Sequence, residues 1–578
     1  MAVGNARIAD IFDEVGDLLE ISGENFFRVR AYHNAARVVR DLSTSIEAVA
    51  AEGDRDLTEL SGIGKDLAGK IQTILETGDL PMRQELESKI PIGLMDVMKV
   101  AGIGPRKAHT LFLELGVKDL DSLGEAARSG DIRKLKGFGP RTEDNILEGI
   151  YAVKGMGNRV LWSEAERLST SVTEYMQALG GLRAIEAAGS FRRLRETVGD
   201  LDLLVICDDP ELASQRFVSH PDVVRVIAHG PTKTSVVMGR DSQVDIRIVP
   251  AESFGAALQY FTGSQAHAVA VRSMALRKGM KLNEYGVYRE DERIAGLTEE
   301  DVYAAIGLPW IPPELRENRG EIRAALEGRL PALIEQRQIR GDLHVHTDTT
   351  DGRDTLETMV AEAKKRGYLY IAITNHTQRV TMVGGLDERG LLEHWEAVER
   401  VAESVEGIHV LKGVEVDILK DGSLDIAGDV LARADVVVAS VHYDTDMPRP
   451  RMTRRIIRAL ENPFVDILGH PTGRKLNERP PYNVNMDDVI TAAARTGTAL
   501  ELNSNPKRLD LDDANCRSAR EHGVKVVVAT DAHSARELGF MRYGINQARR
   551  GWLEKGDVLN TATYRGLAKA LRKKVRAA

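Results

Sequence analysis

Three aspartates on two strand-like segments have the types and spacing to bind divalent cations. Asp200 and Asp202 open an apolar run, and alternation along a strand places both carboxylates on one face. Asp245 lies within a second apolar run, residues 243–249. Three carboxylates can hold two ions, Mg²⁺ or Mn²⁺, one activating an attacking 3′-hydroxyl and the other steadying a triphosphate. A solvated strand edge is the alternative, but the third aspartate favours a catalytic site for nucleotidyl transfer.

A short glycine turn precedes these aspartates. Gly189 and Ser190 can cradle phosphate with backbone N–H groups and a hydroxyl. Arg193 adds a cation that can clamp a phosphate. Gly199 directly precedes the first aspartate and belongs to the same predicted nucleotide-binding set.

A second set of metal-binding side chains lies in the C-terminal region. His344 and His346 are two residues apart on a predicted strand, so they face the same way, as ligands of one site must. Other candidates follow later apolar runs. The full set is His344, His346, Asp351, His376, Glu415, His442, His470, Asp531 and His533. Mixed imidazole and carboxylate ligands suit Mn²⁺ or Zn²⁺ better than Mg²⁺ alone, and this set predicts up to three ions.

The elements that must position these ligands repeat along the chain. With the strand at residues 500–503, the apolar runs give seven strand units separated by helical stretches. This rhythm predicts a (β/α)7 barrel, in which C-terminal strand ends converge on one mouth. A metal cluster there would lower the pKa of a bridging water and steady a phosphate under attack. A lone histidine of this kind is usually a packed or surface residue, but packing does not explain nine ligands at strand ends.

A glycine pattern repeats three times in the N-terminal region. Helical segments flank each copy. The copies place glycines at Gly62 and Gly64, Gly102 and Gly104, and Gly137 and Gly139. Glycines permit a tight turn between two helices and leave backbone N–H groups available to a phosphate oxygen. Three copies favour helix-hairpin-helix DNA binding over a simple bend between helices.

Five short motifs resemble those of the family X DNA polymerases, the group that includes DNA polymerase beta. They are residues 189–193, 199–202, 244–247, 260–264 and 282–285. The resemblance implies that the three aspartates bind the catalytic metals. It also implies that Tyr260, Phe261 and Gly263 form the turn that packs on the incoming sugar, and that Arg272 contacts the template strand. Without it, core packing would be the preferred interpretation of the two aromatic residues.

The same resemblance raises a lyase activity in the N-terminal region. Lys70 falls where some members carry a Schiff-base lysine, and Tyr32 matches another residue of that site. A lysine forms an imine only if its amine is partly neutral. A plain phosphate-contacting lysine is the alternative that the residues favour.

The C-terminal region resembles the polymerase and histidinol phosphatase (PHP) domain, and the fusion order resembles that of bacterial family X DNA polymerases. The resemblance implies a manganese-stimulated 3′-to-5′ exonuclease that can also act as an abasic-site endonuclease or remove 3′-phosphates.

Three positions depart from these families. Ala268 stands where an asparagine often contacts the nucleotide, and Val198 where a serine binds phosphate. Nucleotide binding is therefore expected to be weaker, or to depend on His267 or Gln265. Asn375 replaces an aspartate that could orient the following histidine, and all nine ligand positions are filled.

The expected fold is multidomain, α+β and α/β: a helix-hairpin-helix region, a nucleotidyltransferase palm and a seven-stranded PHP barrel. The predicted divisions are residues 1–85 (lyase-like), 86–150 (helix-hairpin-helix), 151–255 (palm), 256–315 (nucleotide and template binding), 316–338 (linker) and 339–578 (barrel).

Composition limits the partners. The formal charge of −9 means that DNA contacts must be local, because the molecule is not a polycation. The two cysteines, Cys207 and Cys516, fit a reducing cytoplasm, and no apolar run is long enough for a membrane. We expect a cytoplasmic monomer whose partners are gapped or primer-template DNA and dNTPs.

Three alternatives stay open at this stage. The polymerase part could mainly position DNA for a nuclease or abasic-site endonuclease, which Ala268 and Val198 support. The chain could be a non-catalytic DNA-binding repair scaffold, which complete ligand sets argue against. It could be a small-molecule phosphatase, which the glycine repeat disfavours.

Overall fold

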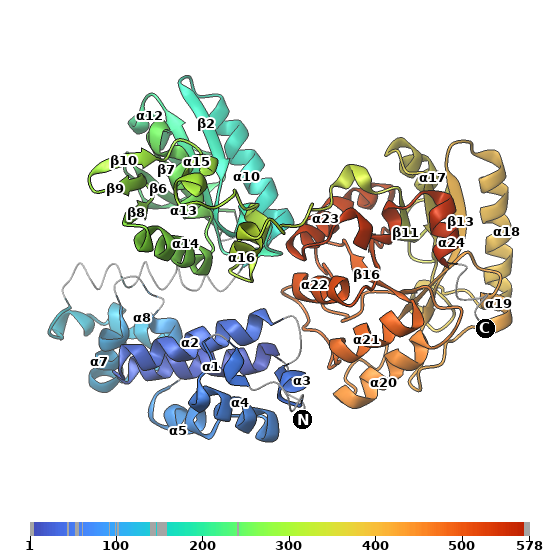
Figure 1. The fold of residues 1–578 in the computed structure, drawn as a ribbon, viewed down its shortest axis with the longest axis horizontal. Helices are drawn as coiled ribbons and strands as arrows, with labels where there is room; N and C mark the ends of the chain where they lie inside the picture. The colour runs from blue at the N-terminus through green and yellow to red at the C-terminus, as the bar shows by residue number, and fades with distance from the viewer. Residues whose placement is uncertain are drawn as a thin grey trace. The chain divides into compact units, whose positions relative to one another are not determined.

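The computed structural model describes residues 5–571 except 43–45, 52–56, 61, 92, 99, 101–102, 139–145, 147–158 and 240–241. The chain divides into two compact units, Met1–Asn158 and Arg159–Ala578 (Figure 1). Within the described residues, no helix is both long and apolar enough to cross a membrane.

The first unit is helical. Its main helices are α1 (Asn5–Ile21), α2 (Phe26–Asp41), α3 (Ile46–Ala51), α4 (Lys65–Thr77), α5 (Pro81–Lys89), α6 (Leu94–Met98), α7 (Pro105–Leu115) and α8 (Leu120–Arg128). Two hydrophobic cores stabilise it. Helix α1 contributes to both, because Phe12 lies in the core shared with α2 and α4, and Leu18 lies in the core shared with α6 and α7.

The second unit begins with a five-stranded mixed sheet in the order β2-β4-β7-β6-β5, here called the palm sheet. The strands are β2 (Leu182–Ala187), β4 (Asp200–Cys207), β5 (Val223–Ala228), β6 (Lys233–Met238) and β7 (Ser242–Ile248). Strands β4 and β7 pair in parallel, and the other neighbours are antiparallel. Helices α10 (Trp162–Gln177) and α12 (Pro210–Val218) supply Val172, Met176 and Phe217 to the core of this sheet.

A smaller subdomain follows the palm sheet. It contains α13 (Phe254–Thr262), α14 (Gln265–Arg277), a sheet of β8 (Met280–Asn283), β9 (Gly286–Arg289) and β10 (Glu292–Ala295), α15 (Glu299–Ala305) and α16 (Glu321–Leu326). Arg316 and Glu321, in the predicted linker, are fully buried. Arg316 pairs with Glu299 and Glu321 with His267, each at 2.6 Å, so this segment packs against the subdomain.

The third region is a parallel sheet of seven strands in sequence order, which confirms the predicted barrel. The strands are β11 (Gly341–Val345), β12 (Tyr370–Ile373), β13 (His409–Asp417), β14 (Val436–Ser440), β15 (Ile467–Leu468), β16 (Ala499–Asn503) and β17 (Val526–Ala529). A bridge between Val345 and Ala532 brings the last strand beside the first.

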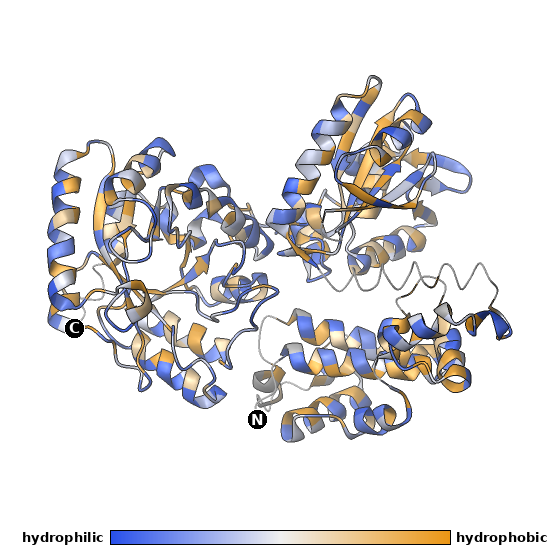
Figure 2. Ribbon diagram, turned by 180° about the vertical axis from the view of Figure 1, so that it is seen from behind, coloured by the Kyte–Doolittle hydropathy of each residue, from blue (hydrophilic) through white to orange (hydrophobic). Residues whose placement is uncertain are grey.

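Helices connect the barrel strands or follow the last of them. They are α17 (Leu356–Lys365), α18 (Glu388–Ser404), α19 (Gly428–Leu431), α20 (Arg449–Leu460), α21 (Met486–Thr496), α22 (Asp513–Glu521), α23 (Met541–Arg550) and α24 (Tyr564–Leu571). Side chains cap several of their N-termini; Asp387, for example, accepts a hydrogen bond from the Gly390 N–H at the start of α18. Hydrophilic and hydrophobic residues alternate along α18, as expected of a helix with one buried face (Figure 2).

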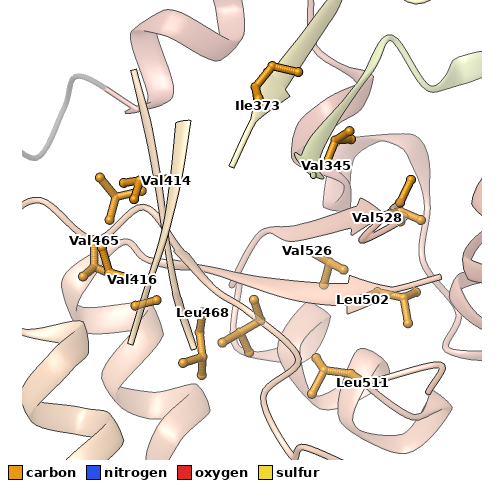
Figure 3. Close-up of a cluster of buried hydrophobic side chains, with 14 of the residues drawn as sticks. Val345, Ile373, Val414, Val416, Val465, Leu468, Leu502, Leu511, Val526 and Val528 are labelled. Carbon is orange, nitrogen blue, oxygen red and sulfur yellow. The ribbon is translucent and has the colours of Figure 1, made fainter. Parts of the chain in front are cut away.

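Alternation along the barrel strands separates two layers of side chains. Val414 and Val416 of β13 and Val526 and Val528 of β17 belong to the main core cluster, part of which Figure 3 shows. Residues of the opposite parity face the barrel interior. This second layer carries the functional side chains described next.

Two candidate catalytic centres

Glu415 lies at the centre of the predicted barrel ligands. Its carboxylate oxygens approach ring nitrogens of five histidines. The distances are 2.9 Å to His376, 3.2 Å to His470, 3.3 Å to His344, 3.3 Å to His442 and 3.5 Å to His346. Glu415 lies four residues after Leu411, an interior residue of β13. Because side chains alternate along a strand, Glu415 also points into the barrel.

The remaining ligands join this group through Asp531 and Asp351. Asp531 Oδ1 lies 3.1 Å from His346 Nε2, and Asp351 Oδ2 lies 3.0 Å from His533 Nε2 and 3.4 Å from His376 Nε2. The structure therefore brings all nine predicted residues into one connected cluster. Three overlapping groups within it could each hold an ion: His346–Asp351–His376–His533, His344–His346–Asp531 and His376–Glu415–His442.

The chemistry of this cluster fits divalent cations. Several buried atoms lie close to one another without forming a hydrogen bond of good geometry: His344 Nε2, both ring nitrogens of His346, His376 Nδ1 and both carboxylate oxygens of Glu415. Burying such atoms without a partner is costly, and a cation at their point of convergence would satisfy them. Burial alone would lower the pKa of His376, yet Glu415 and Asp351 raise it to about 10. The neighbouring carboxylates thus favour positive charge at His376.

Two ligands have strained backbones. His470 and Asp531 have φ angles of 25° and 52°, in the left-handed region that residues other than glycine rarely adopt. Both residues lie just beyond barrel strands. Strain of this kind is typical of functional sites, where the surrounding structure fixes a side chain in a required direction.

A layer of carboxylates that was not predicted from the sequence lies behind the ligands. Glu501 of β16 accepts a hydrogen bond from His344 Nδ1 at 2.7 Å, and Asp417 of β13 accepts one from His442 Nδ1 at 3.2 Å. Both are buried. Such partners fix the tautomer and orientation of a metal-binding histidine. The available signal was strand parity, because Asp417 lies two residues after Glu415.

Asn375 does not orient a ligand through its side chain. Its side-chain oxygen Oδ1 accepts a hydrogen bond from the Thr347 N–H at 2.8 Å, and its side-chain Nδ2 donates to Thr347 Oγ1 at 2.8 Å. The amide also contacts His394 Nε2 at 3.1 Å. Asn375 therefore anchors the loop after β11. Its side-chain hydrogen bonds go to residues outside the nine ligands, so the loss of charge at this position does not act on a ligand through them.

The palm aspartates occupy adjacent strands. Asp202 of β4 pairs in register with Asp245 of β7, and Asp200 lies one alternation away on the same strand face. Burial, together with the charges of Asp200 and Asp245, raises the pKa of Asp202 to about 7. A carboxylate that resists ionisation beside two others is suited to cations, which remove the repulsion.

Two basic side chains accompany these carboxylates. Lys233 Nζ lies 2.8 Å from Asp245 Oδ2, and Arg247 Nε lies 3.8 Å from Asp202 Oδ1. Lys233, which comes from β6, was not predicted from the sequence. Its proximity depends on the antiparallel register of β6 and β7, where Ser235 lies opposite Asp245.

The predicted phosphate turn lies beside the aspartates. Gly189 has φ of 61°, and a Cβ there would lie 3.1 Å from Asp202 Oδ2, so a side chain would crowd the carboxylate. Ser190 follows in the short helix α11 (Gly189–Arg192). Arg193 donates to the Thr262 carbonyl at 2.6 Å and to Glu317 at 3.1 Å. Gly199, before β4, leaves room for Arg159.

The predicted sugar-contacting turn closes the same region. The Tyr260 and Phe261 rings meet edge to face at 5.0 Å, and Arg247 lies 4.2 Å from the Phe261 ring centroid. A Cβ on Gly263 would lie 3.2 Å from Arg193. Arg272, exposed on α14, lies 5.8 Å from the Tyr260 ring centroid.

The departures from the polymerase motifs pack in the interior. Val198 and Ala268 are 1% and 8% exposed. The suggestion that His267 supports the nucleotide is wrong, because its buried ring is held by Glu321 at 2.6 Å and Tyr303 at 2.8 Å.

The described residues of the glycine repeat share one hydrogen bond in all three copies. Ile63, Ile103 and Phe138 each donate a backbone hydrogen bond to the carbonyl three residues earlier. Gly62 and Gly137 have φ of 99° and 92°, the region that favours glycine.

The second glycines of the first two copies stand at helix starts. Gly64 and Gly104 are the N-caps of α4 and α7, and among the described residues no atom beyond the adjoining chain lies within 4 Å of a Cβ built on either. A phosphate could therefore approach these N–H groups closely. Gly102 and Gly139 lie outside the described residues.

Lys70 does not have the environment of a neutral amine. It forms an ion pair with Asp66, and its ammonium lies 5.1 Å from the Tyr32 ring centroid. Burial would lower its pKa, but Asp66 and Tyr32 outweigh burial and raise it. This direction disfavours imine formation.

Comparison with known protein families matches successive parts of the chain. Family models match residues 3–80 (helix-hairpin-helix domain), 94–150 (SAM-like helix-hairpin-helix tandem), 159–238 (DNA polymerase beta palm), 257–317 (DNA polymerase beta thumb) and 342–505 (PHP domain).

Relatives match either the whole chain or the barrel. A Bacillus subtilis (strain 168) protein named DNA polymerase/3′-5′ exonuclease PolX is 36% identical over 570 residues, covering 98% of this chain and 99% of the relative. A protein of Thermoanaerobacter sp. (strain X514) named probable phosphatase is 31% identical over 231 residues, which is 38% of this chain and 89% of the relative. The chain therefore belongs to the family X DNA polymerases that carry a PHP domain.

Proposed function

We propose that this chain fills short DNA gaps during repair by adding dNTPs to 3′ ends, and that its barrel trims 3′ ends. The family membership makes it a DNA polymerase with a 3′-to-5′ exonuclease. The observation that carries the proposal is the presence of two separate ligand clusters, each within its own domain. One is the carboxylate group on β4 and β7, and the other is the nine-residue group in the barrel.

In the palm, Asp200, Asp202 and Asp245 would hold Mg²⁺ or Mn²⁺. Bound divalent ions would supply Lewis acidity to a 3′-hydroxyl or water and neutralise the phosphate under attack. Gly189 and Ser190 would receive the triphosphate with backbone N–H groups, and the absence of a Cβ at Gly189 keeps that approach open.

The palm residues around the aspartates would orient the nucleotide. Arg193 would attract the triphosphate as a bidentate-capable cation. The half-buried rings of Tyr260 and Phe261 would pack on the sugar, and Arg272 would contact the template strand.

In the barrel, the nine residues would hold up to three ions, and Mn²⁺ or Zn²⁺ suits the imidazole content. Glu415, at the centre, would be shared between ions, while Asp351, His442 and His533 are the most exposed of the set and would border the DNA end. Glu501 and Asp417 would hold His344 and His442 in their metal-binding orientation.

The helical unit would grip the DNA backbone through its glycine turns. We propose phosphate contacts at Gly62, Gly64, Gly104 and Gly137, with Gly102 and Gly139 completing the pattern. We propose that Lys70 also contacts phosphate, since its raised pKa keeps it charged. Borohydride trapping on an incised abasic duplex tests this: a covalent adduct lost in Lys70→Ala would show a lyase instead.

The main experiment uses a labelled gapped duplex with and without dNTPs. Asp200→Ala should lose extension and keep 3′ trimming, and His344→Ala should lose trimming and keep extension. Loss of both activities in either variant, with the fold intact by circular dichroism, would reject the assignment of separate centres. A chain that trims but does not extend would favour a nuclease whose palm only positions DNA.

A second barrel activity is supported by the likeness to proteins named probable phosphatase. We propose that the barrel also removes a 3′-terminal phosphate. A duplex with a blocked 3′-phosphate should become extendable with wild type and stay blocked with His344→Ala. Persistence of the phosphate during active trimming of hydroxyl ends would reject this activity.

A further inference from the structure

The segment 189–196, which carries the proposed triphosphate contacts, is held by side chains of the barrel domain. Arg550, the last residue of α23, donates Nη1 to the Arg193 carbonyl at 2.7 Å. Glu196 accepts hydrogen bonds from Arg474 at 2.6 Å and from Gln547 at 3.2 Å. Arg474 and Arg550 are buried. The backbone of this polymerase segment is therefore fixed by the exonuclease domain.

The same arginine shares a carboxylate with Arg193. Glu317 Oε1 accepts from Arg193 Nε and from Arg550 Nη1, each at 3.1 Å, and Arg195 lies 3.8 Å away. Burial would raise the pKa of Glu317, but Arg550 and Arg193 hold it at about 2, so it stays ionised. Arg550 also donates to Asp513 at 2.7 Å.

Three guanidinium groups thus converge on one carboxylate. A single negative charge cannot neutralise all three guanidinium groups. Asp513 compensates part of the charge of Arg550, but the surroundings of Arg193 still retain positive charge. Without Arg550, the Glu317 carboxylate would pair more closely with Arg193 and compensate more of its positive charge. An Arg193 whose charge is more fully compensated by Glu317 would attract a triphosphate less strongly, because the interaction depends on net charge in a region of low dielectric.

We propose that Arg550 of the barrel domain is a positioning residue for the polymerase nucleotide site. It binds Glu317 and the Arg193 carbonyl, and so keeps Arg193 oriented and its charge less compensated by Glu317 when the triphosphate of the incoming dNTP binds. This inference rests on the proposed role of Arg193. It makes the exonuclease domain a structural part of the polymerase centre, apart from its own metal cluster.

The test measures KM for dNTP, kcat and 3′ trimming with the full-length chain on one gapped duplex. Arg550→Gln should raise the KM for dNTP about tenfold, the scale of one lost charge-assisted hydrogen bond, and leave trimming unchanged. Glu317→Gln in the same chain removes the charge that Arg550 occupies. The double variant should therefore have a KM within about twofold of Glu317→Gln alone.

Arg542→Gln is the matched control. Arg542 lies on the same helix and forms a palm–barrel ion pair with Glu166 at 2.7 Å, but it does not contact segment 189–196. Its KM for dNTP should equal that of wild type. An equal rise in KM for Arg542→Gln and Arg550→Gln, or a double variant whose KM clearly exceeds that of Glu317→Gln alone, would overturn the inference in favour of general interface loss.

Arg193→Gln separates this inference from the proposed function. If its KM for dNTP does not rise, the proposed role of Arg193 fails and the inference fails with it. If Arg193→Gln raises KM and Arg550→Gln does not, only the inference fails. Should Arg550→Gln not fold, Arg550→Lys decides: it keeps the charge with fewer donors, so its KM should rise by a smaller factor, and an unchanged KM would overturn the inference.

Discussion

The two centres of the second unit hold their ligands in opposite ways. In the barrel, eight residues from separate strands and loops surround the buried carboxylate of Glu415, and a further layer of carboxylates supports the histidines. In the palm, the three aspartates lie on two adjacent strands, with Lys233 and Arg247 beside them. One centre is enclosed by protein, and the other is partly exposed, since Asp200 faces solvent.

This difference indicates how each centre acquires its metal. Imidazole nitrogens with hydrogen-bonded partners behind them bind transition metals firmly and stay in place. A few carboxylates with a competing lysine bind Mg²⁺ weakly, and Mg²⁺ commonly arrives with substrate phosphates. We therefore expect a resident metal cluster in the barrel and a nucleotide-recruited metal site in the palm.

The largest expected effect is the loss of trimming, but not of restorable extension, when metals are removed by chelation. Treatment with EDTA followed by desalting should lower trimming at least about a hundredfold, since the metal supplies several kcal/mol to the attack on phosphate. Extension should return in full when Mg²⁺ and dNTPs are added, while trimming should need Mn²⁺ or Zn²⁺. Trimming restored by Mg²⁺ alone to its starting rate would contradict the comparison.

A smaller effect is expected from the support layer. Glu501→Gln keeps the shape but loses the charge behind His344, so metal affinity in the barrel should fall about 10- to 100-fold. Titration of trimming with Mn²⁺ measures the shift, and extension serves as the internal reference. Glu478→Gln, at an exposed ion pair with Lys507, is the matched control and should leave the titration unchanged. An unchanged Mn²⁺ titration in Glu501→Gln would show that this carboxylate does not affect metal affinity in the barrel.

The smallest expected effect concerns Lys233. Its ammonium competes with cations for Asp245, so Lys233→Met should lower the Mg²⁺ concentration that half-saturates extension by about two- to fivefold, the scale of a partly exposed ion pair. Lys281→Met, at an exposed position of β8, is the control. A higher Mg²⁺ requirement in Lys233→Met would mean that the lysine assists the metal site.

Most of both centres could be predicted from the sequence because strand alternation is a local property. The parity of Asp200 with Asp202, and of His344 with His346, fixed which side chains share a face before any pairing was known. Barrel closure then brought the predicted ligands together. The seven-strand rhythm was also local, since each strand was a short apolar run followed by a helix.

The missed residues depend on pairing between distant segments. Glu501 meets His344 only because β16 and β11 face the same barrel interior, and Lys233 meets Asp245 only through the register of β6 and β7. Neither residue belongs to a motif. His267 was misassigned for a similar reason, since its partners Tyr303 and Glu321 come from later in the chain.

The central claim is that the barrel holds its metal independently of the palm. Metal content of the purified full-length chain, measured by plasma mass spectrometry after desalting, tests it most directly. Wild type and the triple variant Asp200→Ala, Asp202→Ala, Asp245→Ala should retain the same content, up to three transition-metal ions per chain. His344→Ala with His376→Ala should lose most of it. Metal lost from the palm variant, or kept by the barrel variant, would contradict the account.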